Sequence, residues 1–322
     1  LYDKTILGGG VIVAQGGGHT WGPVTYTLTP NVILPIGATV EDAFLYLSFD
    51  NLENGEMCVT LIRPAPPVVL CDPFVNQIPP GTVGPYNYCT ARYDVTPYII
   101  ANGTYQVVVA QTSGWSSVYG AMLIVIYKHL PSFTYARVMI HDGCWWLSNG
   151  VGGVDDFYDV NIGPNAYLTH AYLTTMVQGA ENNLYDDLLF WGHNKPYLVL
   201  GGNCFNSRSD YFNDSTPYQT YNDLWDVDRF EVTSSFQAHG SGISDTVSPR
   251  SVGSGPMLPD GFIVDVDMLD IYYENIPVRA PVGGIAFPAD KLALLAPWII
   301  LGTLIAIASV SVAVYWRRRY LS

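Results

Sequence analysis

Three groups of carboxylates in the sequence could hold a cation. They are Asp155, Asp156 and Asp159; Asp186 and Asp187; and Asp223, Asp226 and Asp228. Clustered carboxylate oxygens are the ligands that Ca²⁺ takes in surface domains, so Asp155, Asp156 and Asp159 are weak candidates for a Ca²⁺ site. None of the groups has the spacing of the twelve-residue calcium loop, and solvated loop charge is the alternative. No other cofactor is expected.

The five cysteines stand at positions 58, 71, 89, 144 and 204. Cys58 and Cys71 flank a turn at residues 63–66 symmetrically, so a hairpin would place them opposite one another, close enough for a disulfide. Cys89 and Cys144 form the second predicted pair, which leaves Cys204 as a thiol. The sequence has no CxxC or CxxCH motif, so it does not support a zinc ribbon or covalent haem.

Catalytic patterns are weak in this sequence. The six histidines are scattered without the spacing of metal ligands, and no G-x-S-x-G motif occurs. A pair of glycosidase carboxylates could still lie among the 28 acidic residues. We predict that the chain is not an enzyme. Two tripeptides match the pattern for N-glycosylation, and they make Asn102 and Asn213 candidate acceptors.

Residues 292–316 form an apolar run without a charged side chain. About 20 such residues suffice to cross a bilayer as a helix, so residues 291–316 are predicted to be a transmembrane helix. Arg317, Arg318 and Arg319 follow the run and Lys291 precedes it, which places the C-terminus on the cytoplasmic side. The preceding domains would then be extracellular or outside a virion membrane. The export that this orientation requires predicts a signal peptide removed before Leu1.

Composition fits an external location. Four of the 14 Lys and Arg residues belong to the predicted anchor and its flanks. The residues before the anchor therefore carry ten Lys and Arg against 28 Asp and Glu, a net charge of −18. Such an acidic chain lacks the basic surface that nucleic acids require. The 23 tyrosines and 8 tryptophans provide rings of the kind that anchor interfaces. The predicted partners are therefore the lipid bilayer, through residues 292–316, and other copies of the chain or other envelope proteins.

Short strand-like runs separated by Asp, Asn, Pro and Gly fill the region between residues 21 and 140, and parts of this pattern recur. The matches are 43–45 with 171–173, 66–70 with 196–200, 92–96 with 224–228, and 122–127 with 268–273. The third match makes Asp94 and Asp226 equivalent, each capping a turn. The sequence predicts an all-β chain of two tandem antiparallel β-sandwich, jelly-roll-like domains plus one C-terminal transmembrane helix.

The predicted boundaries follow from glycine-rich and proline-rich stretches. Residues 1–20 are an N-terminal strand segment, either an edge strand or a strand donated to a neighbouring subunit. The rest divides into a first sandwich at 21–150, a second sandwich at 151–277, a stalk at 278–290, the helix at 291–316 and a cytoplasmic tail at 317–322.

The first copy resembles an uncharacterised family of archaeal and bacterial cell-surface domains. The resemblance rests on RYDVT at 92–96 and YGAMLIVIY at 119–127, and it covers roughly residues 38–145. It implies a β-sandwich in an exported, membrane-anchored protein, and it brings no catalytic residues.

Three functions remain open at this point. The favoured one is a non-enzymatic, membrane-anchored structural protein that assembles into a surface layer or filament, most plausibly archaeal. A double jelly-roll capsid or envelope protein of a virus is the alternative, and an anchored adhesin or carbohydrate-active enzyme is the third.

Overall fold

The computed structural model describes fifteen stretches of the chain. They are residues 2–21, 23–50, 58–64, 66–71, 73–78, 88–110, 117–130, 132–148, 155–157, 166–178, 188–192, 198–202, 225–233, 245–250 and 261–275. This part of the chain is all-β and antiparallel, as predicted. Residues Leu1–Ile276 form one compact unit and Pro277–Ser322 another. No helix within the fifteen stretches is long and apolar enough to span a membrane, and the predicted helix lies outside them.

Nine strands from the first half of the chain form one sheet, in the order β6-β5-β9-β3-β2-β10-β4-β8-β7. Their bounds are β2 Gly9–Trp21, β3 Val24–Val32, β4 Thr39–Asp50, β5 Val59–Ile62, β6 Val68–Leu70, β7 Phe74–Ile78, β8 Tyr88–Asp94, β9 Gly103–Val109 and β10 Ser117–Lys128. A 3₁₀ turn, η1, covers Thr96–Tyr98. The strand β10 is buried from Ser117 to Ile126, because both faces of this sheet are covered.

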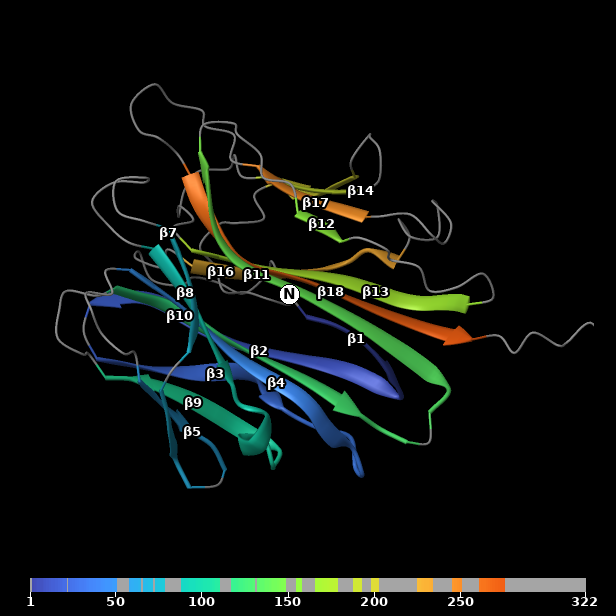
Figure 1. Ribbon diagram of the computed structural model, residues 1–322, viewed down its shortest axis with the longest axis horizontal. Coiled ribbons are helices and arrows are strands. Elements are labelled where there is room, and N and C mark those ends of the chain that lie inside the picture. Colours follow the sequence, from blue (N-terminus) through green and yellow to red (C-terminus); the bar gives the residue numbers. More distant parts are fainter. Residues whose placement is uncertain are drawn as a thin grey trace, which may run out of the picture. The chain divides into compact units, whose positions relative to one another are not determined.

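A five-stranded sheet has the order β1-β11-β18-β13-β16 and faces the nine-stranded sheet (Figure 1). Its strands are β1 Tyr2–Leu7, β11 Thr134–Ser148, β13 Ala166–Gln178, β16 Trp225–Glu231 and β18 Gly261–Asn275. A four-stranded sheet, in the order β12-β17-β14-β15, contains β12 Asp155–Phe157, β14 Leu188–Gly192, β15 Leu198–Gly202 and β17 Asp245–Arg250.

Three hydrophobic cores follow from the alternation of side chains along these strands. Leu45 and Leu123 belong to the core within the curled nine-stranded sheet. Met122 and Ile124, on the opposite face, pack against Val266 and Met268 of the five-stranded sheet. A third core, around Leu173 and Leu269, covers the far face of the five-stranded sheet.

Trp225 is the largest fully buried side chain between the two sheets. It lies on β16 and packs against two glycines of the nine-stranded sheet. A Cβ atom added to Gly17 or Gly120 would lie 2.1 Å or 2.4 Å from an atom of the indole ring. Glycine therefore stands at these two strand positions because the ring leaves no room for a side chain.

The internal repeat is present in the strand pairing. In the first copy β4 lies between β10 and β8, and in the second copy β13 lies between β18 and β16. Leu45 pairs with Leu123, and Leu173 pairs with Leu269 in the same way. These pairs confirm the predicted matches of 43–45 with 171–173 and of 122–127 with 268–273.

The predicted match of 92–96 with 224–228 is wrong. Backbone hydrogen bonds run from Val95 N to Ala43 O at 2.9 Å and from Val232 N to Ala171 O at 2.8 Å. They make RYDVT at 92–96 equivalent to RFEVT at 229–233. The hydroxyl of the threonine that ends each motif accepts the N–H of the same alanine, Ala43 or Ala171, at 2.9 Å in both copies.

This register changes the role given to the acidic residues. The second-copy equivalent of Asp94 is Glu231, and Asp226 is not equivalent to it. Asp94 Oδ1 accepts the N–H of Thr96 at 3.0 Å, which confirms the predicted turn cap. The sequence led to the wrong match because the WDVD segment shares Asp and Val with YDVT, whereas RFEVT preserves the physical type of every residue.

The N-terminal segment is integral to both sheets. Strand β1 pairs with β11 over six residues, and β2 pairs with β10 along almost its whole length. The chain's own strands thus take up the segment, and the idea of a strand donated to a neighbouring subunit is not supported. The division into two domains stays a prediction, because β1 and β11 come from the first half of the chain yet belong to the five-stranded sheet.

Candidate functional site

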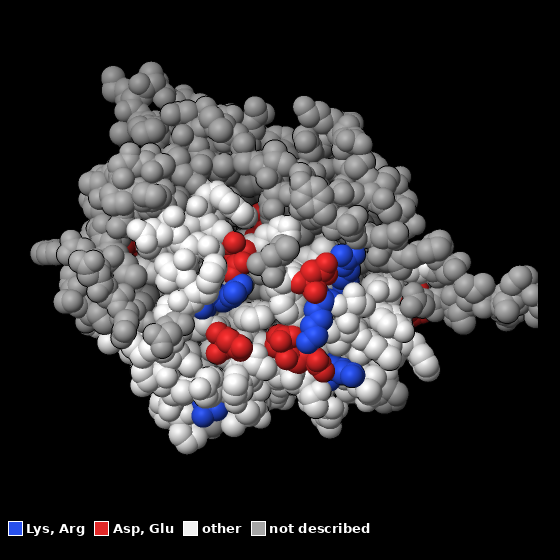
Figure 2. Space-filling view, viewed as in Figure 1, with Lys and Arg blue, Asp and Glu red and all other residues white. Residues whose placement is uncertain are grey.

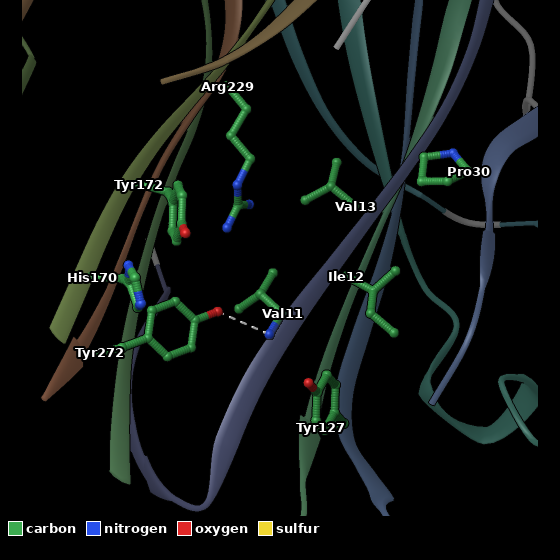
Figure 3. Close-up of a pocket in the computed structure, with 9 residues that line it drawn as sticks. All are labelled: Val11, Ile12, Val13, Pro30, Tyr127, His170, Tyr172, Arg229 and Tyr272. Carbon is green, nitrogen blue, oxygen red and sulfur yellow. Dashed lines mark hydrogen bonds between the residues drawn. The ribbon is translucent and has the colours of Figure 1, made fainter. Parts of the chain in front are cut away.

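A pocket of about 480 Å³ opens between the two sheets (Figure 3). Its size is that of a ligand site in a protein. The nine-stranded sheet contributes a mainly apolar wall, and the five-stranded sheet contributes rings and one cation. The lining residues are Val11, Ile12, Val13, Pro30 and Tyr127 from the first sheet and His170, Tyr172, Arg229 and Tyr272 from the second.

Arg229 is the only lysine or arginine among the lining residues, and its position is fixed by the protein. Its NH2 group donates to Asp270 Oδ2 at 2.5 Å, and its NH1 group donates to Thr174 Oγ1 at 3.3 Å. Asp270 is fully buried, and this burial raises the pKa of its carboxyl while the Arg229 charge lowers it. The pair places a planar guanidinium in the pocket with little net charge.

The rings of the pocket stack on this cation. The Arg229 Cζ atom lies 4.5 Å from the centre of the Tyr172 ring, within the range of a cation–π contact. His170 stacks on Tyr172 with centroids 6.0 Å apart, and its Nδ1 lies 3.4 Å from Glu231 Oε1. Tyr172 and His170 therefore form a flat, rigid surface on one side of the pocket.

Tyr272 bridges the two sheets at the base of this surface. Its hydroxyl accepts the backbone N–H of Val11 at 3.1 Å, as Figure 3 shows. Burial and the nearby Asp270 charge raise its pKa well above 10. The hydroxyl is thus protonated at neutral pH, and it can donate to a ligand or to Asp270 but cannot act as a base.

Sequence reasoning missed these residues. His170 and Tyr172 lie on β13, Arg229 on β16 and Tyr272 on β18, and each reads as an ordinary strand residue. The sequence did contain one signal of a buried polar site. The apolar strand β18 is interrupted by Asp265, Asp267 and Asp270, and a carboxylate in a buried strand requires a partner such as an arginine.

A second polar cluster lies deep between the sheets around Asp265. Ser48 Oγ donates to Asp265 Oδ2 at 2.5 Å, Gln178 Nε2 donates to Oδ1 at 2.7 Å, and Thr90 Oγ1 donates to Oδ1 as well. Burial raises the pKa of Asp265 to about 7, against the lowering effect of these three donors. Trp225 Nε1 donates to Ser48 Oγ at 3.2 Å and so connects this cluster to the indole ring.

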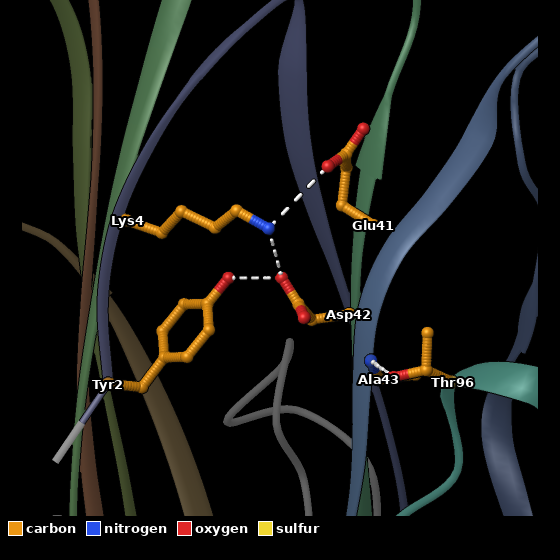
Figure 4. A network of polar contacts seen from close by, with 6 residues as sticks. All are labelled: Tyr2, Lys4, Glu41, Asp42, Ala43 and Thr96. Atoms are coloured by element: carbon orange, nitrogen blue, oxygen red, sulfur yellow. Dashed lines mark hydrogen bonds and ion pairs between the residues drawn. The ribbon is translucent and has the colours of Figure 1, made fainter.

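Several charged side chains elsewhere lie beside opposite charges. Lys4 Nζ lies 2.8 Å from Asp42 Oδ2 and 3.5 Å from Glu41 Oε2 (Figure 4). Figure 2 shows acidic and basic groups adjoining one another over one face of the molecule. Partly exposed pairs of this kind add little to stability, but they fix how β1 faces β4.

The structure brings the first predicted cysteine pair together. Cys58 and Cys71 form a disulfide with Cα atoms 4.3 Å apart. Strands β5 and β6 pair with Thr60 opposite Val69, which is the register that the turn predicted.

The structure does not join Cys89 to Cys144. Cys89 lies in the core of the nine-stranded sheet, where burial raises its pKa to about 12. Cys144 lies on β11 in the facing sheet, and its Sγ contacts the carbonyl of Tyr88 at 3.5 Å. The backbone of β8 separates the two thiols, because Cys89 points away from the five-stranded sheet.

The other predicted site residues fall partly outside the described stretches. Asp155 and Asp156 lie on β12, and no three metal-ligating side chains cluster anywhere in the described part of the chain. Asp159, Asn213 and Cys204 lie outside it. Asn102 is exposed, and its amide bonds the backbone of Leu34 through both Oδ1 and Nδ2, at 2.8 and 3.2 Å.

A family model called "Protein of unknown function (DUF3344)" matches residues 2–248. The chain belongs to the DUF3344 family. The match extends into the second β-rich half and ends before β18, whereas the resemblance seen in the sequence covered the first half alone. It does not itself indicate a cell-surface location. No curated protein matches the chain.

Three solved structures share a low similarity with this DUF3344 protein. They are peptide-N(4)-(N-acetyl-β-D-glucosaminyl) asparagine amidase (10% identity, 83% of this chain and 97% of that one, TM-score 0.31), a chain of the Sputnik virophage (10%, 88% and 93%, 0.23) and a putative secreted protein from Parabacteroides distasonis (8%, 82% and 89%, 0.18). None of these likenesses reaches a TM-score that would assign an activity.

The predicted function has no support and is corrected. The prediction was a non-enzymatic subunit of a surface layer or filament, with a viral capsid protein as its alternative. Nothing in the described strands supports a layer, filament or capsid subunit, and we do not take that function further.

Proposed function

We propose that this DUF3344 protein is a binding protein whose pocket between the two sheets takes a ligand with a flat, uncharged ring. The observation that carries the proposal is the Arg229–Tyr172 stack, held in place by buried Asp270. A ring lying against Tyr172 and His170 would face the apolar wall of Val11 and Val13 on its other side. Such a sandwich between rings and aliphatic side chains favours a flat ligand.

The proposal is binding without catalysis. Arg229 already donates to Asp270 and Thr174, and Asp270 balances its charge. The pKa of Tyr272 is raised well above 10, so this residue does not take up a proton from a ligand at neutral pH. The pocket therefore supplies surfaces and hydrogen-bond donors rather than a poised base or nucleophile.

Replacing Tyr172 with alanine is expected to weaken binding of phenol and indole about two- to tenfold. Aromatic pairs contribute about 0.5–1.5 kcal/mol beyond the area they bury, and a loss of 1.4 kcal/mol is tenfold in Kd. Saturation-transfer NMR of the full chain in detergent micelles, with each compound titrated, measures the change.

Tyr167→Ala is the matched control, since Tyr167 lies on the same strand and is 59% exposed outside the pocket. It should leave binding unchanged. Two results would refute the pocket as the ligand site. One is that Tyr172→Ala, Tyr167→Ala and the wild-type chain bind phenol equally well, and the other is that none of them binds it.

We further propose that residues 292–316 anchor the protein in a lipid bilayer, with the β-sheets on the outer side. Replacing Leu301 and Ile305 together with arginine puts two charges into the apolar run, each costing about 2.5–3.5 kcal/mol at a helix centre. We expect alkaline extraction to release this variant from membranes and to leave the unchanged chain in the pellet. Release of both would contradict the anchor. Self-association and contact with envelope proteins stay predictions.

A further inference from the structure

The internal repeat relates the pocket to a groove that the chain itself fills. Strand β2 flanks β10 in the first copy as β11 flanks β18 in the second. Val13 pairs with Ile124, and Val138 pairs with Asp270 at the equivalent place. Strand β1 occupies the outer edge of β11 from Leu7 opposite Tyr135 to Tyr2 opposite Ile140.

In the described part of the chain, no strand pairs with the equivalent edge of β2 over residues 10–14. Within the described stretches, β3 pairs with β2 at a single position, Gln15 opposite Thr29. The next residue of β3 is Pro30, and no further pairing of β3 with β2 follows it in the described part of the chain. The open edge lines the pocket, since Val11, Ile12, Val13 and Pro30 are all among its walls.

The backbone groups of this edge point into the pocket. The N–H of Val11 is directed at Tyr272 rather than at β10. Along an antiparallel strand, every second residue points its N–H and C=O the same way, so those of Val13 share this direction. The Tyr272 hydroxyl thus accepts the hydrogen bond from the Val11 N–H that the carbonyl of a paired strand would otherwise accept.

The walls around the open edge correspond to the walls around β1. The equivalent residues, by register, are Val11 and Ala136, Val13 and Val138, His170 and Asp42, Tyr172 and Phe44, and Arg229 and Arg92. Beside the filled groove, Lys4 of β1 reaches Asp42, as Figure 4 shows, and Ile6 is buried in the core between the sheets. The pocket is therefore the open counterpart of the groove that holds β1.

We propose that the ligand of the pocket is an extended peptide segment that adds to β2 antiparallel, over residues 10–14, as β1 adds to β11. This inference rests on the proposed function and names its ligand class. Alternate side chains of a strand face the same wall, so the peptide residue opposite Val11 takes the place of Ile6 and is apolar. The residue opposite Val13 takes the place of Lys4. In the filled groove Lys4 reaches Asp42, and the residue equivalent to Asp42 in the pocket is His170, which lies beside Arg229 and Tyr172. The peptide residue at this place is therefore expected to carry a flat, uncharged side chain instead of a lysine.

The probes are two synthetic peptides with the sequence of β1, Tyr2–Leu7. One keeps the parent sequence and the other carries Lys4→Phe. We expect the Lys4→Phe peptide to bind the full chain in detergent micelles at least about tenfold more tightly than the parent, measured by isothermal titration calorimetry. Methylating the backbone nitrogen of the Phe removes a donor from the ladder and should weaken binding further.

Tyr272→Phe separates strand addition from simple ring binding. The variant lacks the hydroxyl that accepts the Val11 N–H. A carbonyl of the bound peptide can then accept this N–H without competition. A net hydrogen bond of about 0.5–1.5 kcal/mol predicts peptide affinity about two- to tenfold higher. Phenol has no backbone carbonyl to accept the Val11 N–H, so the same variant should not bind phenol more tightly. Tyr167→Ala again serves as the control and should alter neither.

Two outcomes would overturn the peptide proposal. One is phenol binding that depends on Tyr172 while neither peptide binds, which would leave the proposed function intact. The other is peptide binding that is insensitive to backbone methylation and to Tyr272→Phe. Loss of phenol binding as well would refute the proposed function itself.

Discussion

Replacing Trp225 with alanine is expected to lower the free energy of unfolding by about 3–5 kcal/mol, the usual loss for a large aromatic side chain in a core. The indole ring is fully buried between the two sheets, and its Nε1–H donates to Ser48. Removing it leaves a cavity that faces two glycines, which have no side chains to move into the space. Urea denaturation of the full chain, followed by tyrosine fluorescence and circular dichroism, measures the loss.

A double substitution tests the packing that explains this loss. Gly120→Ala should be destabilising on its own, because the added methyl would lie 2.4 Å from the indole ring. In the Trp225→Ala background the same methyl enters the cavity and should cost much less. Val69→Ala, at a side chain that is 65% exposed, is the control and should change stability by under about 0.5 kcal/mol. Additive effects of the two core substitutions would contradict direct packing.

The second large effect is a dependence of stability on pH that comes from Asp265. Burial raises the pKa of this carboxyl in the folded chain to about 7, from 3.8. The folded state therefore holds the proton more tightly than the unfolded state. Stability contributed by this group is fully present below about pH 4 and falls as the pH rises to about 7. At 1.36 kcal/mol for each pKa unit, the fall is roughly 4 kcal/mol.

Asp265→Asn should abolish this part of the pH dependence. The amide oxygen can accept from Thr90 and Gln178, and the amide nitrogen can donate to Ser48. We expect the variant to match the unchanged chain near pH 4 and to exceed it in stability at pH 8, by urea denaturation across the range. Glu274→Gln, at an exposed residue of the same strand, is the control. A variant with the same slope between pH 4 and 7 as the unchanged chain would contradict the assignment.

Local patterns in the sequence predicted local structure well. The turn at residues 63–66 sets the register of β5 and β6, and hence the Cys58–Cys71 bond, because a hairpin is decided by residues close together in the chain. The strands β4, β10, β13 and β18 were recognisable as repeats for the same reason: their apolar alternation is a property of each strand alone.

The pocket depends on contacts that no local pattern encodes. Val11 and Tyr272 are 261 residues apart, yet they share a hydrogen bond. Arg229 meets Asp270 across an intervening strand. The second-copy motif was also misplaced by a few residues, which hid the equivalence of Arg92 and Arg229 and with it the kinship of the two grooves. Membrane attachment and the acceptor at Asn213 fall on residues for which the structure offers no test.

The order of strands in the five-stranded sheet determines when the protein can fold during synthesis. Its central strand, β18, is the last of all the described strands to be made, and its edge strand, β1, is the first. Until residue 275 has emerged, β11 and β13 have no strand between them, and Asp270 is not yet available to Arg229. The facing edges of β11 and β13 therefore stay unpaired until more than 250 residues have been made. The cell that makes this protein has to protect those edges from aggregation until the final strand is made.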